Sequence, residues 1–135
     1  MKASISFPEL QNILQEKIEQ NIGFAFVDDK TVKVTYPLNL GIIKKDISAD
    51  LTILEMTGSD LLVKLDAGMG TDTLMNTVLS ILHNKIPEGL IEKRPDRQLM
   101  LHLGSIKQVK TVFDAIKVDD IHVLTEGLEV EGGLK

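Results

Sequence analysis

Residues 46–66, DISADLTILEMTGSDLLVKLD, decide the fold class of this chain. Apolar and polar residues alternate over residues 47–53. Leu61, Val63 and Leu65 then recur at the same spacing, with Lys64 and Asp66 on the other face. Successive side chains of a strand point to opposite faces, so this period of two predicts two half-buried strands. The residues MTGS supply a turn between them. The two strands are therefore expected to form an antiparallel hairpin.

Further strands are expected in neighbouring pairs on both sides of this hairpin. The predicted pairs are 24–27 with 31–36, 90–93 with 98–103, and 121–124 with 128–130. Pro37 has no N–H group to give to a sheet, so it is expected to limit the strand that precedes it. Because short turns join the members of each pair, an antiparallel sheet is favoured over parallel crossover units.

Three helices are predicted from apolar stripes at helical spacing. The first begins at Ser6, a suitable N-cap, and is expected to end at Gly23. The second covers residues 74–87, and the third carries its stripe on residues 106–116. Together the patterns predict a single α+β domain over residues 1–135. Its sheet is expected to be mainly antiparallel.

The composition is that of an ordinary folded domain, and it excludes several kinds of site. The chain has no cysteine, which excludes disulfides, thiolate nucleophiles and cysteine-ligated metals. Its net charge of −5 argues against nucleic acid as a partner, because binding phosphates needs clustered Lys and Arg. The apolar runs are too short for a transmembrane segment. The localisation stays open: cytoplasmic if Met1 is the native start, or exported if a signal segment has been removed.

The motifs identify no catalytic or metal site, and the chain is expected not to be an enzyme and to need no cofactor. Ser59 and Ser105 follow glycines but lack the Gly-x-Ser-x-Gly pattern of a nucleophile. The run Asp119-Asp120-Ile121-His122 could supply two or three metal ligands, and Asp28-Asp29 lies in a turn. Their spacing matches no zinc motif, so solvated carboxylates are the simpler interpretation. The segment Gly68-Met69-Gly70 is expected to be a strand-to-helix turn.

Two features point towards a ligand. Arg94 and Arg97, the only arginines, flank one turn, and guanidinium groups suit a phosphate or carboxylate. The alternative for this pair is a hairpin tip that is merely polar. Aromatic residues make up only 4% of the chain, so the apolar surfaces are aliphatic or methionine, which adapt well to an acyl chain. The alternative for these stripes is an ordinary core.

From about residue 47 onward the order of elements resembles the tubular lipid-binding (TULIP) proteins and related bacterial domains. Three stretches carry the comparison: residues 74–87, the hairpin around Arg94 and Arg97 that leads into residues 99–103, and the closing residues 118–130. In that family a bent antiparallel sheet wraps a long helix, and lipid lies in the groove between them. The resemblance implies the same α+β architecture here: a curved, mainly antiparallel sheet wrapped on one long amphipathic helix, with two further helices. It also implies the same kind of groove and ligand.

The sequence therefore favours a non-enzymatic binding domain for an apolar, lipid-like ligand held between helix and curved sheet. The residues expected to line the groove are Leu74, Val78, Leu82, Leu99, Leu101 and Leu103. Arg94 and Arg97 are expected to contact a headgroup. The alternative is a protein–protein interaction or assembly module with no small-molecule ligand, for which a homodimer is one form.

Overall fold

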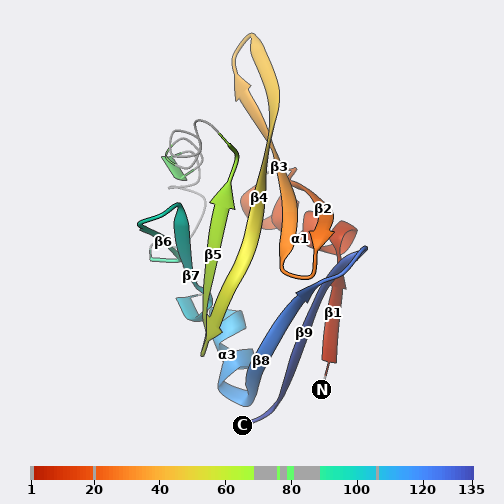
Figure 1. Cartoon of the computed structure of the whole chain (residues 1–135), viewed down its shortest axis with the longest axis vertical. Coiled ribbons are helices and arrows are strands. Elements are labelled where there is room, and N and C mark those ends of the chain that lie inside the picture. The colour runs from red at the N-terminus through yellow and green to blue at the C-terminus, as the bar shows by residue number, and fades with distance from the viewer. Residues whose placement is uncertain (1, 20, 69–75, 77–78, 81–88, 106) are drawn as a thin grey trace.

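The computed structural model describes residues 2–19, 21–68, 76, 79–80, 89–105 and 107–135. Most of these residues lie in strands, which form two antiparallel sheets (Figure 1). The larger sheet contains, in spatial order, β2 (Gly23–Asp28), β3 (Thr31–Leu40), β4 (Ile43–Thr57), β5 (Asp60–Asp66), β7 (Gln98–His102) and β6 (Ile91–Arg94). The smaller sheet contains β1 (Lys2–Ser6), β9 (Gly127–Leu134) and β8 (Ile116–Val123).

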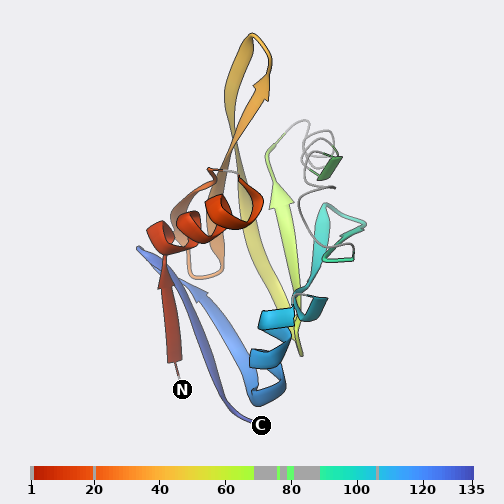
Figure 2. The same cartoon turned by 180° about the vertical axis from the view of Figure 1, so that it is seen from behind.

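Helical segments flank the two sheets. The helix α1 (Phe7–Ile18) lies across β2 and β3 on one face of the larger sheet (Figure 2). A short 3-10 turn, η1 (Leu103–Ser105), and the helix α3 (Lys107–Ala115) connect β7 of the larger sheet to β8 of the smaller one. None of the described helices is long and apolar enough to span a membrane.

The predicted fold class, a curved sheet wrapped on one long helix with two further helices, was wrong. The strands divide into two sheets, and α1 packs on one of them rather than being enclosed. The predicted helix at residues 74–87 falls almost entirely outside the described residues. The division was missed because β1 pairs with β9, for example Ile5 with Leu128, across almost the whole chain. Local patterns carry no signal for such a pairing.

The predicted hairpins are present, and one runs further than expected. In the hairpin of residues 46–66, Leu51 pairs with Leu65 and Ile53 with Val63. Pro37 does not end β3, because it pairs with Asp46 in a ribbon that continues to Leu40. The pairing of β2 with β3 stops at Thr35, so a proline beyond that point can face an open edge without loss of a ladder bond. The hairpin of β3 and β4 projects at the end of the molecule opposite α3 (Figure 1).

The predicted start of α1 is confirmed, but its predicted end was wrong. Ser6 caps the helix by accepting the Glu9 N–H at 3.2 Å, and the Glu9 carboxylate reaches back to the Ser6 N–H at 3.3 Å. The helix ends at Glu19, which has a left-handed backbone and donates its N–H to the Gln15 carbonyl. Gly23, the predicted cap, begins β2 instead.

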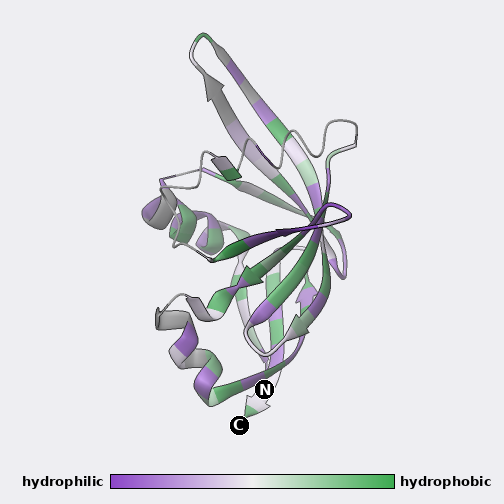
Figure 3. Ribbon diagram, turned by 90° about the vertical axis from the view of Figure 1, so that its left-hand side faces the viewer, coloured by the Kyte–Doolittle hydropathy of each residue, from purple (hydrophilic) through white to green (hydrophobic). Residues whose placement is uncertain are grey.

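The two sheets share a small apolar core. Phe7 of α1, Val32 of β3 and Val123 of β8 are buried together. Phe24 stacks on Phe7 with ring centroids 6.0 Å apart, and Leu128 of β9 packs against the same cluster. Figure 3 shows hydrophobic and hydrophilic residues alternating along the strands that surround it. The period of two in the sequence thus places one face of each strand towards this core.

Gly127 of β9 allows a close approach to the backbone of β1, next to the start of α1. A Cβ atom at this position would lie 2.1 Å from the Ile5 carbonyl oxygen and 2.8 Å from the Ser6 Cα. Both are backbone atoms, so neither can move aside cheaply. Gly133 on the same strand has nothing within 4 Å of the equivalent position.

We therefore predict that Gly127→Ala lowers the free energy of unfolding by about 1–3 kcal/mol, because the added methyl group forces β1 and β9 apart. The matched control Gly133→Ala is expected to change it by less than about 0.5 kcal/mol. Urea unfolding followed by circular dichroism measures both variants. Equal effects of the two substitutions would contradict the close approach at Gly127.

Candidate functional site

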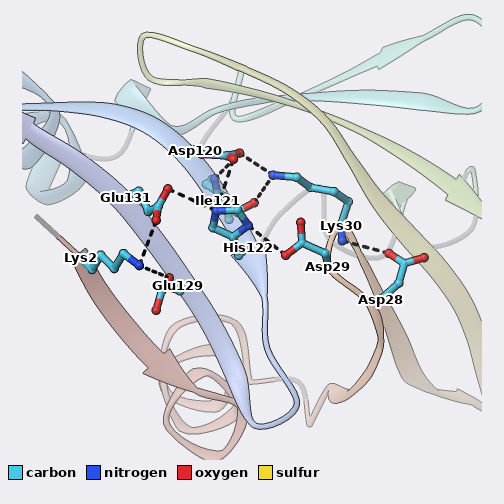
Figure 4. A network of polar contacts seen from close by, with 9 residues as sticks. All are labelled: Lys2, Asp28, Asp29, Lys30, Asp120, Ile121, His122, Glu129 and Glu131. Atoms are coloured by element: carbon cyan, nitrogen blue, oxygen red, sulfur yellow. Dashed lines mark hydrogen bonds and ion pairs between the residues drawn. The ribbon is translucent and has the colours of Figure 1, made fainter.

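Polar side chains from both sheets meet where the turn between β2 and β3 touches the end of β8 (Figure 4). At the centre of this junction the Val123 N–H donates to the Asp29 carbonyl oxygen at 2.7 Å. The Lys30 carbonyl in turn accepts the Ile53 N–H at 2.7 Å, which ties the turn to β4. The junction thus rests on backbone hydrogen bonds before any side chain contributes.

Lys30 reaches from the turn across to β8. Its ammonium group contacts the Asp120 carboxylate and donates to the Ile121 carbonyl oxygen at 2.6 Å. The Lys30 ammonium, followed by the Ile121 N–H, lowers the pKa of Asp120. The Asp28 carboxylate accepts the Lys30 backbone N–H at 2.9 Å and so fixes the shape of the turn.

His122 lies between three carboxylates. Its Nδ1 is 2.9 Å from Oδ1 of Asp29, while its Nε2 is 3.3 Å from both Asp120 Oδ2 and Glu131 Oε2. The hydrogen bond with Asp29, followed by that with Glu131, raises the pKa of His122. Lys2 of β1 contacts Glu131 at 3.2 Å and, ahead of His122, lowers the pKa of that carboxyl. The imidazole therefore sits in a field that favours its protonated form.

Asp120, His122 and Glu131 also have the chemistry of a metal site. Their ligand atoms all lie within 4.8 Å of one another, and one nitrogen with two carboxylates suits a divalent transition metal. However, Lys30 contacts Asp120 and Lys2 contacts Glu131, so both carboxylates already have cationic partners. The group is accounted for as an ion-pair network, and we assign no metal to it.

A cleft of about 960 Å³ opens at the beginning of β8, between the two sheets. Apolar side chains on its wall come from β4, α3 and β8: Met56, Phe113, Ile116 and Val118. Ser59, Asp60 and His102 line it from the larger sheet, and three lysines, Lys110, Lys117 and Lys135, line it from α3, β8 and the chain end. Asp114 of α3 lines it as well. The cleft is therefore amphipathic, with apolar side chains beside both lysines and aspartates.

Both ring nitrogens of His102 contact carboxylates. Its Nδ1 is 2.9 Å from Asp60 Oδ1, as in an Asp–His pair, but its Nε2 is 3.1 Å from Oε2 of Glu92. These two contacts, that with Asp60 first, raise the pKa of His102. Both ring nitrogens thus face carboxylates rather than the hydroxyl of Ser59 or Ser105, which also line the cleft.

The three predicted ligand-lining residues that the structure describes do not line this cleft. Leu99 and Leu101 lie on β7 and Leu103 lies in η1; all three are half-buried and none belongs to the described lining. The other three, Leu74, Val78 and Leu82, fall outside the described residues.

The two predicted headgroup contacts each have an acidic partner on the larger sheet. Arg94 contacts Glu92 at 3.0 Å, and Arg97 contacts Asp66 at 3.9 Å. The acidic turn at Asp28-Asp29 and the acidic run around Asp120 are both visible in the sequence, but the sequence does not bring them together. No role was assigned from the sequence to Lys30 or to the lysines of the cleft. A lysine in an otherwise acidic turn was the only available signal for Lys30.

Comparison of the chain with protein-family models, with curated proteins and with solved structures gave no match. The function is therefore argued from the geometry of the junction and the cleft.

We predict that Lys30→Met destabilises the protein by about 1 kcal/mol, because the Ile121 carbonyl loses its donor and Asp120 loses its partner. The apolar stem of the side chain is kept, so the change isolates the ammonium group. Lys33→Met, on the exposed side of β3, is the matched control and is expected to be nearly neutral. Thermal and urea unfolding measure both variants, and a neutral Lys30→Met would show that the contact contributes nothing.

Proposed function

We propose that this protein is a non-enzymatic binding domain for an apolar, lipid-like ligand, and that the ligand occupies the cleft between the two sheets. The observation that supports this best is the cleft itself, with Met56, Phe113, Ile116 and Val118 on its wall and a volume of about 960 Å³. Ligand sites are commonly concave, mainly apolar, and of this size. Aliphatic and thioether side chains adapt to a flexible chain.

The three lysines of the cleft suit a ligand with an anionic headgroup. The Lys110 ammonium forms an ion pair with the Asp114 carboxylate at 3.0 Å, and the Lys117 ammonium forms one with the Asp119 carboxylate at 3.9 Å. Exposed ion pairs of this kind are weak, so an incoming carboxylate or phosphate can compete for the ammonium groups. The long lysine stems can also cover an apolar chain while the charges stay in water.

This site differs from the groove expected from the sequence. Its described helical wall is α3, through Phe113, whereas the helix predicted at residues 74–87 lies almost entirely outside the described residues. Its polar contacts come from lysines and not from Arg94 and Arg97. The class of ligand remains the one that the aliphatic composition favours.

A protein–protein interaction module is the second candidate, and one observation favours it. The hairpin of β3 and β4 projects from the molecule, and Ile42 in its turn is fully exposed to solvent. An apolar side chain at the tip of a projecting hairpin suits contact with another protein. Such a partner would leave the cleft empty.

We expect native mass spectrometry of gently purified protein to show a bound species of a few hundred daltons at fixed stoichiometry, the mass range of a single lipid-like molecule. In vitro, a fluorescent fatty acid should bind the wild type and bind Phe113→Asp at least about tenfold more weakly, because the substitution places a charge on the apolar wall. Phe26→Asp is the matched control, since Phe26 is 44% exposed on β2 and does not line the cleft.

Circular dichroism must show that both variants fold. A ligand-free mass together with equal probe binding by all three proteins would overturn the proposal. An oligomer in that ligand-free spectrum would favour the interaction module.

A further inference from the structure

We propose that His122 is a proton-dependent latch between the two sheets, closed when the imidazole carries both protons and loosened when it loses one. The inference starts from the position of the ring. His122 belongs to β8 of the smaller sheet, and its Nδ1 contacts Asp29 in the β2–β3 turn of the larger sheet at 2.9 Å. Its Nε2 contacts Glu131 of β9, on its own side of the junction, at 3.3 Å.

Only a doubly protonated ring can satisfy both sides. A neutral imidazole has one N–H donor and one lone pair, whereas all the groups it contacts here are carboxylate oxygens, which accept. If the neutral ring keeps its proton on Nδ1 for Asp29, its Nε2 lone pair faces Asp120 and Glu131. If it keeps the proton on Nε2, the contact across the junction becomes repulsive. Either tautomer weakens the network.

Of the cationic groups at the junction, His122 is the one that contacts Asp29. The groups that face it are Asp29 from the turn, Asp120 on the same strand, and Glu131 and Glu129 from β9, of which Glu129 is its register partner. Lys30 and Lys2 lie beside them (Figure 4). Lys30 contacts Asp120 and Lys2 contacts Glu131. Among the described contacts, Asp29 has His122 as its cationic partner. Loss of the proton from His122 therefore leaves the Asp29 carboxylate without a positive charge beside it.

The direction of the pH dependence follows from the raised pKa of His122. A group whose pKa is higher in the joined state stabilises that state fully below its ordinary pKa of 6.5. This stabilisation is lost as the pH rises through the higher pKa of the folded protein. The latch is thus closed in mildly acidic solution and loosens on the alkaline side.

The same strand connects the latch to the cleft. Ile116, Lys117 and Val118 at the start of β8 form one wall, and residues 56–60 of the larger sheet form another. When the contact between His122 and Asp29 weakens, the end of β8 is attached less strongly to the larger sheet. The distance between the two walls of the cleft is then less fixed. We therefore infer that ligand affinity falls as the pH rises, a step that rests on the proposed function, whereas the latch itself does not.

The chain provides a matched control for this latch in His102. This ring also lies between two carboxylates, Asp60 and Glu92, and its pKa is also raised. All three residues belong to strands of the larger sheet, β7, β5 and β6, so no contact of this group crosses between sheets. Replacing His102 removes an equivalent titrating group while leaving the junction intact.

The test is hydrogen exchange of the Val123 amide, whose bond to Asp29 spans the junction, from about pH 5.5 to about pH 8.5. After correction for intrinsic exchange, its protection in the wild type and in His102→Asn should fall as the pH rises. The fall should be about tenfold for each unit by which the pKa of His122 is raised in the closed state. In His122→Asn the protection should be low and independent of pH. A flat profile in the wild type, or a falling profile in His122→Asn, would overturn the latch.

A parallel titration measures the affinity of the cleft for a neutral acyl probe, whose charge is constant over this pH range. Affinity that falls with pH in the wild type and not in His122→Asn supports the coupling, and unchanged affinity overturns it. If the probe binds at no pH, the proposed function fails, while the exchange of Val123 still decides the latch.

Discussion

The contact between the β2–β3 turn and the end of β8 is the constraint on which the rest of this structure depends. Its centre is the hydrogen bond from the Val123 N–H to the Asp29 carbonyl, with buried Val32 and Val123 on one side and the His122 network on the other. Because β9 pairs with β8 and β1 pairs with β9, this contact positions the smaller sheet. The cleft exists because the sheets meet here and remain apart where β8 begins.

Apolar and polar contacts contribute differently to this junction. Burial of Phe7, Val32 and Val123 supplies most of the stabilisation, since burying such a side chain contributes roughly 1.5–3 kcal/mol. The ion pairs are partly exposed, and pairs of that kind contribute little net stability. The ion pairs instead determine the geometry with which the turn contacts β8. In the proposed latch, His122 makes this contact depend on pH.

Local features of the fold could be predicted from the sequence, and distant pairings could not. Alternation in residues 46–66 predicts β4 and β5, and Ser6 with Glu9 predicts the start of α1, because these signals involve near neighbours. The pairing of Lys2–Ser6 with Gly127–Leu134 has no local signal, so the second sheet was missed. The same holds for the candidate site: its local segments could be predicted, but the contacts between distant segments could not. The acidic turn at Asp28-Asp29 and the acidic run around Asp120 were recognised, but Lys30 and Asp120 are 90 residues apart. The cleft is assembled from several separate segments.

A double-mutant cycle on Val32 and Val123 tests most directly whether the two sheets meet through this junction. Val32 lies on β3 of the larger sheet and Val123 on β8 of the smaller one, and both belong to one buried cluster, so packing across the junction should couple them energetically. Unfolding free energies of Val32→Ala, Val123→Ala and the double variant should give a coupling of about 0.5 kcal/mol or more. Effects that add to within about 0.3 kcal/mol would contradict the arrangement of the sheets.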